Sequence, residues 1–196
     1  MADKLIKHQF MRKIIYQRLN WKYNITDCSN SDIDQLINIF FKMITERDFE
    51  KEFFKEEPIS LESFRNIVNV FVDYMKEEGL VDKDAKNSDI DKEYVENLVE
   101  SLLYAERMYL YCTFIAGNRN IMGMTKMPST IRKAFATLGY MTMTDLALIY
   151  SNTNDPKNLP GIGPDKYGKF QKYMALDCDE FEVYDKYNKY NKISEE

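Results

Sequence analysis

The sequence predicts an all-α protein, in which a helical N-terminal domain is followed by a small helix-hairpin-helix domain. Apolar residues recur at the three- and four-residue spacing of helices through most of the chain. Proline and glycine are scarce before residue 117, and that part of the sequence has no alternating strand pattern bounded by turn residues. Both residues become frequent afterwards, so the composition changes between two parts of the chain.

The N-terminal domain is expected to span residues 1–120 as a bundle of four or five helices. Amphipathic patterns predict helices over 5–19, 32–44, 60–78 and 88–117. The third is the clearest, because Ser60 can cap its start and Gly79 can end it. Ser88 or Asp89 is expected to cap the fourth.

The second domain is expected over residues 128–176. Its helices are predicted over 129–138, over 145–150, and from a glycine hairpin to about 176. Ser129 is expected to cap the first of them, and Thr142 or Thr144 the second.

Two further segments are expected to lie outside both domains. Residues 117–128 combine glycine, proline and methionine without clear periodicity, as in a linker or loop. Residues 177–196 form an acidic, tyrosine-rich tail, which is expected to be partly mobile.

The net charge of −5 is spread unevenly along the chain. Residues 1–25 carry six Lys or Arg against one acid, and residues 26–100 carry nine against twenty. Residues 125–176 carry seven against three. A phosphate ligand responds to the local field rather than to net charge. Both basic segments are therefore candidates for contact with nucleic acid.

Catalytic and metal-binding patterns do not stand out. The chain has one histidine, and its cysteines, Cys28, Cys112 and Cys178, are far apart in sequence. Walker A, G-x-S-x-G and H-E-x-x-H motifs are missing. We therefore expect no enzyme activity, no metal site and no cofactor. We also expect a cytoplasmic location and no membrane contact, because the sequence has neither an apolar run of about 18 residues nor a signal-peptide pattern.

The most informative motif is the hairpin Leu159-Pro160-Gly161-Ile162-Gly163-Pro164. Its two glycines are expected to turn the chain with positive φ and to leave backbone N–H groups bare at the start of the next helix. A helix N-terminus of this kind attracts phosphate. The alternative is a turn that only packs two helices together.

With the hairpin, the segment from Thr130 to Leu148 resembles the C-terminal domain of the bacterial RNA polymerase α subunit. The shared pattern is an Arg-bearing helix, a Gly-x-x-Thr-x-x-Asp-Leu step, and Leu-x-Gly-Ile-Gly before a last helix. It covers about 45 residues within 128–176. The resemblance implies contact with the DNA minor groove and phosphates through an arginine that matches Arg132 and through a hairpin surface that matches Gly161, Gly163 and Lys166.

Two departures from that pattern favour backbone contact over groove reading. Phe135 stands where the family usually has an asparagine, and Asp165 stands where it tends to have a basic residue. For Arg132 and Lys133, a solvated helix face is an open alternative to DNA contact.

The sequence thus predicts a non-catalytic DNA-binding or DNA-associated protein that contacts the phosphate backbone of DNA. Its predicted binding residues are Arg132, Lys133, Gly161, Gly163, Lys166 and Lys169. The N-terminal domain is expected to bind a protein partner or to self-associate into an oligomer. Its basic first helix, from Lys4 to Lys22, is either a second phosphate strip or pairs with the acidic middle of the chain. The alternative function is a protein-interaction adaptor or inhibitor, whose acidic helical domain binds a protein partner.

Overall fold

The computed structural model describes residues 2–49, 51, 59–152 and 159–178, and within these ranges the protein is all helical. The only β pairing among them is an isolated antiparallel bridge between Asn120 and Thr142. The all-α prediction is therefore confirmed. The seven α-helices of the described ranges are α1 (Ala2–Lys22), α2 (Asn30–Glu46), α4 (Leu61–Glu77), α5 (Lys92–Leu110), α6 (Ser129–Thr137), α7 (Met143–Asn152) and α8 (Pro164–Lys172).

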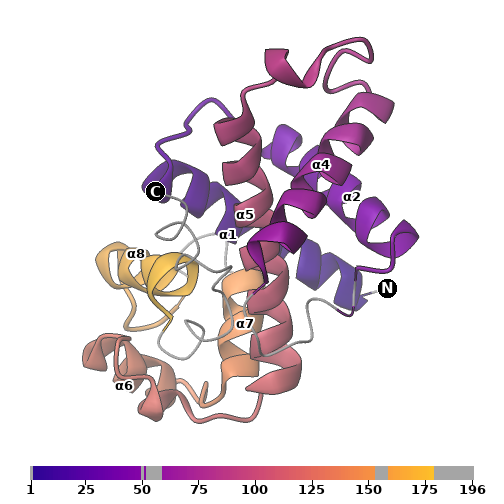
Figure 1. Cartoon of the computed structure of the whole chain (residues 1–196). Helices are drawn as coiled ribbons and strands as arrows, with labels where there is room; N and C mark the ends of the chain where they lie inside the picture. The colour runs from indigo at the N-terminus through magenta and orange to yellow at the C-terminus, as the bar shows by residue number, and fades with distance from the viewer. Residues whose placement is uncertain (1, 50, 52–58, 153–158, 179–196) are drawn as a thin grey trace.

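Helix α1 lies at the centre of the fold and packs most extensively against α5, α7 and α2 (Figure 1). It also contacts α8 and the π-helical turn η5 (Tyr173–Asp177) that continues α8. Side chains on several sides of α1 are buried, among them Phe10, Met11, Ile15 and Leu19. The first helix of the chain thus packs against elements of both the N-terminal and the C-terminal segments.

The starts and ends of α2 and α4 follow ordinary capping chemistry. Ser29 accepts a bond from the Asp32 backbone N–H at 3.2 Å, and the Asp32 carboxylate accepts the Ser29 N–H at 2.8 Å. These reciprocal bonds form a capping box. Ser60 caps α4 as expected, and Gly79 follows its end with φ of +77°. A left-handed residue at this position is a common helix terminator.

The expected cap of α5 is wrong by two or three residues. Ser88 and Asp89 lie in a 3-10 turn, η1 (Asn87–Asp89), and the cap is Asp91, whose carboxylate accepts the Tyr94 N–H at 3.0 Å. The helix is also shorter than predicted, because Tyr111–Ile115 form a π-helical turn, η2, after Leu110.

The segment expected to be a linker, residues 117–128, is packed into the fold. It contains the 3-10 turn η3 (Ile121–Gly123), and the side chains of Ile121, Met124 and Met127 are buried. The Thr144 hydroxyl donates to the Gly117 carbonyl at 3.2 Å. One continuous cluster of buried residues crosses this segment. A division into domains at 120–128 stays a prediction, and any boundary there is crossed by core contacts.

The short connection between α6 and α7 is held by hydrogen bonds among residues close together in the sequence. Pro128, not Ser129, occupies the N-cap position of α6, which has no side-chain capping bond. Gly139 ends α6 with φ of +86°. Thr142, one of the two expected caps, precedes α7, and its hydroxyl accepts the Asp145 N–H at 3.2 Å. The Asp145 carboxylate in turn accepts the N–H groups of Met141 and Thr142, each at 2.9 Å. The Gly-x-x-Thr-x-x-Asp pattern is thus a helix stop followed by a helix start.

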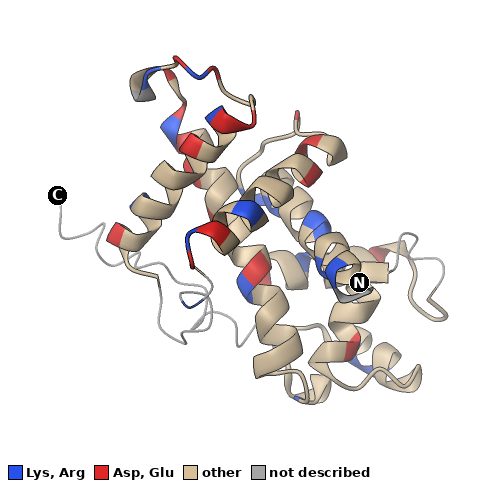
Figure 2. Cartoon of the chain, turned by 90° about the vertical axis from the view of Figure 1, so that its right-hand side faces the viewer, with Lys and Arg blue, Asp and Glu red and all other residues tan. Residues whose placement is uncertain are grey.

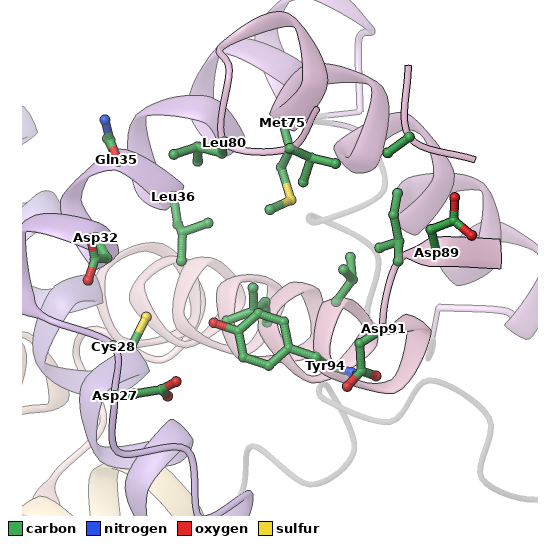
Figure 3. A pocket seen from close by; sticks show the side chains of 15 residues that line it. Asp27, Cys28, Asp32, Gln35, Leu36, Met75, Leu80, Asp89, Asp91 and Tyr94 are labelled. Atoms are coloured by element: carbon green, nitrogen blue, oxygen red, sulfur yellow. The ribbon is translucent and has the colours of Figure 1, made fainter. Parts of the chain in front are cut away.

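The surface has an uneven distribution of charged residues and a cavity. Figure 2 shows Lys and Arg along the helix that begins beside the N label, and acidic residues interspersed with basic ones on the loop at the top. A cavity of about 460 Å³ lies among α2, α4, α5 and that loop (Figure 3).

No helix in the described part of the chain is long and apolar enough to span a bilayer. Apart from residues 177 and 178, the expected acidic tail lies outside the described residues.

Candidate nucleic-acid interface

The hairpin before α8 is a tight turn anchored in the core. Gly161 takes φ of +75°, in the left-handed region that favours glycine. The Ile162 N–H donates to the Leu159 carbonyl at 3.0 Å and closes the turn. The Ile162 side chain is 2% exposed. The motif therefore fixes the start of α8 by burying its central residue between two exposed glycines.

Gly163 corrects one part of the prediction. Its φ and ψ are −80° and 175°, which is extended backbone open to any residue, so the expectation of positive φ is wrong here. It occupies the N-cap position of α8, and it offers no side chain to cap the helix. A Cβ atom built on Gly161 or Gly163 would meet nothing within 4 Å. Both glycines therefore leave the helix start open to an approaching group.

The donors at this helix start are backbone N–H groups. Pro164, the first helical residue, has none, and the first intrahelical bond runs from the Tyr167 N–H to the Gly163 carbonyl at 3.0 Å. The N–H groups of Asp165 and Lys166 precede that bond, so they have no partner within the helix. The positive end of the helix dipole lies at the same place. This arrangement suits an anion, and phosphate is the usual one.

Two lysines lie close to the helix start. Lys166 donates from Nζ to the Gly161 carbonyl at 3.2 Å, which holds its ammonium over the hairpin. Lys169 forms an ion pair with Asp165 at 2.9 Å, and both side chains are largely exposed. Exposed contacts of this kind contribute about 0–1 kcal/mol each. An incoming phosphate can therefore replace them at little cost, although the Asp165 carboxylate opposes its approach.

The two predicted residues of α6 take different roles. Arg132 donates from its guanidinium to the Met122 carbonyl at 2.6 Å and so ties α6 to η3. Lys133 is exposed on the same helix. Phe135 is fully buried and contacts the Phe170 ring, with centroids 4.8 Å apart. The position where the α-subunit pattern usually has an asparagine is therefore a core position here. Gly161, Gly163, Lys166 and Lys169 lie together at the start of α8, whereas Arg132 is engaged elsewhere.

Within the described ranges, four basic residues of α1 form ion pairs, and three of these pairs, those of Arg12, Arg18 and Lys22, are with acids of residues 26–100. Lys7 contacts Glu106 at 2.6 Å. Arg12 contacts Asp34 at 2.6 Å. Lys13 donates to the Tyr150 carbonyl at 2.8 Å, near the end of α7. Pairing with the acidic middle is therefore seen for part of this helix, and phosphate contact by the helix stays a prediction.

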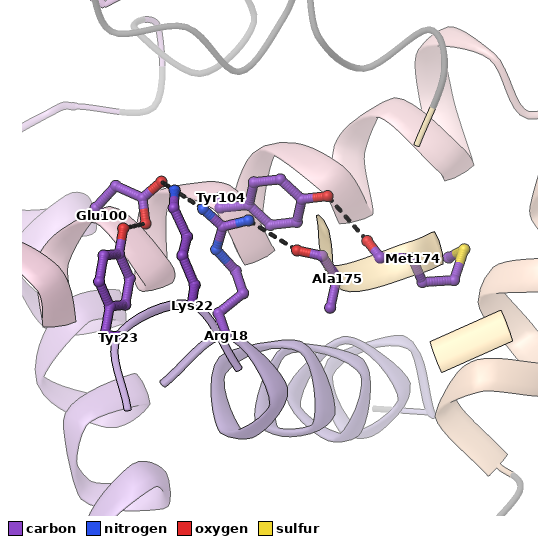
Figure 4. Close-up of polar contacts among 7 residues, drawn as sticks. All are labelled: Arg18, Lys22, Tyr23, Glu100, Tyr104, Met174 and Ala175. Carbon is purple, nitrogen blue, oxygen red and sulfur yellow. Dashed lines mark hydrogen bonds and ion pairs between the residues drawn. The ribbon is translucent and has the colours of Figure 1, made fainter. Parts of the chain in front are cut away.

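A buried network at the centre of the molecule joins α1 to α5 and η5 (Figure 4). Arg18, 2% exposed, bonds to the Glu100 carboxylate and donates to the Ala175 carbonyl at 2.7 Å. Its guanidinium lies 3.7 Å from the centre of the Tyr104 ring. The Tyr104 hydroxyl donates to the Met174 carbonyl at 2.9 Å. The last carbonyls of the final helical segment are thus bound by two side chains from distant elements.

Glu100 stays ionised in this network. Burial raises the pKa of its carboxyl group, but the charges of Arg18 and Lys22, together with bonds from Lys22 and the Tyr23 hydroxyl, lower it below its ordinary value. Sequence reasoning did not identify this network. One signal was present, because Arg18 follows Phe10 and Ile14 at four-residue steps and so shares their buried face.

Comparisons with known proteins do not decide the assignment. No family model, no curated protein and no solved structure matches this chain. Within the described ranges, no three His, Cys, Asp or Glu side chains lie close enough to hold a metal ion. The resemblance to the α-subunit domain therefore remains a prediction from the motif.

Proposed function

We propose that the protein is a non-catalytic, DNA-associated protein that contacts the phosphate backbone through the N-terminus of α8. The observation that carries the proposal is the helix start after Gly163, which has no side-chain cap. Among the described residues, the N–H groups of Asp165 and Lys166 have no partner within the helix, and a Cβ atom on Gly163 would meet nothing within 4 Å. The ammonium of Lys166, held over the hairpin, supports the same assignment.

The proposal predicts weak binding by the isolated protein. One helix start and two or three lysines offer few phosphate contacts, and affinity for DNA rises with the number of phosphates neutralised. Since the α1 cations Lys7, Arg12 and Arg18 are paired with acids, they add little to this count. Useful affinity would then come from a second copy or from a DNA-bound partner, which raises the local concentration.

The substitution Gly163→Asp tests the proposal directly. The extended backbone at this position accepts aspartate without strain, and aspartate is a favourable N-cap residue. Its carboxylate would bond the N–H of Asp165 or Lys166 and repel phosphate. We therefore expect equal or higher thermal stability together with loss of binding to duplex, single-stranded and forked DNA at about 50 mM salt, where phosphate contacts are strong.

The matched control is Gly123→Asp, which adds the same charge at another glycine with open space around it. It should leave DNA binding within about twofold of the wild type, because Gly123 lies in η3 and not at the start of α8. Mobility shift and anisotropy would measure binding, and circular dichroism would check the fold. The proposal would be overturned if the wild-type protein bound none of the three DNA forms at low salt. It would also be overturned if the Gly163→Asp protein bound DNA with the affinity of the wild type.

The lysines provide a second test of phosphate contact. Lys166→Glu and Lys133→Glu should weaken binding about equally for different DNA sequences, because phosphate contacts carry no sequence information. Each lost contact should also reduce the slope of log affinity against log salt by about one. Arg132→Glu should affect stability more than binding, because Arg132 already bonds the Met122 carbonyl.

A further inference from the structure

The cavity among α2, α4 and α5 lies outside the predicted DNA-binding residues. Its volume of about 460 Å³ falls in the range of about 300–1,000 Å³ that ligand sites occupy. Apolar side chains form its walls, among them Leu36, Met75, Leu80 and Val81. In Figure 3 the first three of these lie along one side, and Tyr94 lies opposite them.

Four carboxylates lie at the two ends of this cavity. Figure 3 shows Asp27 and Asp32 at one end and Asp89 and Asp91 at the other. Asp32 and Asp91 also cap helices, so their positions are fixed by backbone bonds. The lining residues include no lysine, arginine or histidine. The cavity is therefore an apolar trough with negative charge at both ends.

The remaining polar groups of the lining are neutral near pH 7. Burial raises the pKa of Tyr94 to about 12, with smaller contributions from Cys28 and Asp27. Burial likewise raises the pKa of the Cys28 thiol, which therefore carries little of the thiolate that reactive cysteines need. The charge of the cavity thus comes from its carboxylates, and its chemistry is that of binding.

We propose that this cavity binds a segment of a partner protein in which two basic side chains flank an apolar one. The basic groups would meet the aspartates at the two ends, and the apolar side chain would cover Leu36, Met75 and Leu80. A free diamine could also place two positive charges at the two ends of the cavity. Its unbranched methylene chain would fill less of the space between them than a leucine or phenylalanine side chain would, so we favour a peptide segment. The assignment does not depend on the hairpin binding DNA.

A labelled peptide, fluorescein-Gly-Lys-Leu-Leu-Lys-Gly, is the probe for this site. The full-length protein should bind it at low salt, and should not bind the peptide with glutamate in place of both lysines. The double substitution Asp27→Asn with Asp89→Asn should weaken binding about tenfold, as expected for the loss of two partly exposed ion pairs. These two aspartates do not cap helices, so the fold should be retained.

Asp48→Asn with Asp73→Asn is the matched control, because it removes the same charge from exposed positions outside the cavity. It should leave binding unchanged. Leu80→Gln, at a partly exposed wall position, should weaken the peptide through its apolar side chain. Anisotropy would measure each affinity, and circular dichroism would verify the fold.

Several results would overturn the proposal. They are a wild-type protein that does not bind the basic peptide, equal binding of the acidic peptide, and equal losses in the cavity and control variants. Displacement of the peptide by 1,5-diaminopentane at concentrations like that of the peptide would assign the cavity to a free amine instead.

Discussion

Replacing Arg18 with methionine should cost a large part of the stability of the protein. The change keeps most of the side-chain volume and removes a charge that is 2% exposed. It leaves Glu100 buried with fewer positive partners, and it leaves the Ala175 carbonyl without the donor that now lies 2.7 Å away. Breaking a buried ion pair by removing one partner costs about 3–5 kcal/mol.

Lys22 and Tyr23 still contact Glu100 in this variant, so we expect about 3 kcal/mol, the lower end of that range. A domain is stable by about 5–15 kcal/mol, so the change is easily measured. Urea unfolding at pH 7, followed by circular dichroism, gives the free energy. The control is Lys42→Met, which breaks an exposed pair with Glu78 and should change the free energy of unfolding far less than Arg18→Met does.

The double variant Arg18→Met with Glu100→Leu gives a further check. Once both charges are gone, no uncompensated charge stays buried, so the double variant should be less destabilised than the sum of the single changes. If Arg18→Met costs no more than Lys42→Met, or if the two changes simply add, the network does not stabilise the fold as argued.

Further predictions concern four single positions. Gly161→Ala should lower the unfolding free energy by about 1–2 kcal/mol, because φ of +75° strains an alanine, whereas Gly163→Ser should raise it by a few tenths of a kcal/mol by capping α8; chemical denaturation measures both. Burial, with a smaller effect of Arg12, lowers the pKa of Lys13 to about 8, so between pH 8 and about 10.5 the unfolded chain binds more protons at this lysine and stability should rise with pH. The unfolding free energy of the wild type minus that of Lys13→Met should therefore become more positive from pH 7.5 to pH 10. A constant value would contradict this. Burial raises the pKa of Asp145, but three hydrogen bonds to its carboxylate lower it below its ordinary value. Asp145→Ala should therefore cost roughly 1 kcal/mol of unfolding free energy at pH 6. This cost should shrink as the pH falls below about 4, and urea unfolding at several pH values would measure it.

Local patterns in the sequence were enough to find most helices. Periodic apolar residues and a serine cap defined α4 within about one residue at each end. The cap of α5 could not be chosen in the same way, because Ser88, Asp89 and Asp91 are all capping residues and only the 3-10 turn decides among them. In the expected linker, Ile121, Met124 and Met127 are all buried. The nearby glycine and proline led to the prediction of a loop, and three apolar residues are too few to show a helical period.

Long-range partners explain what local patterns missed. The sequence located the hairpin, and the structure places four of the six predicted residues together at the start of α8. The sequence alone could not show that Arg132 bonds the Met122 carbonyl or that Phe135 is a core residue, because both depend on tertiary contacts. The cavity was missed for the same reason, since its ends come from segments about 60 residues apart.

The central position of α1 has a consequence for the order in which the chain folds. A ribosome delivers α1 before the elements that pack against it. The carbonyl that accepts from Arg18, at Ala175, lies 157 residues later, and the carbonyl that accepts from Lys13, at Tyr150, lies 137 residues later. Contacts of such sequence separation form slowly. A nascent chain shorter than about 175 residues holds an arginine and a glutamate with no completed interior to enclose them. The N-terminal helices should therefore stay accessible to chaperones until α8 and η5 emerge. Truncations that remove these elements should unfold the whole protein rather than one domain.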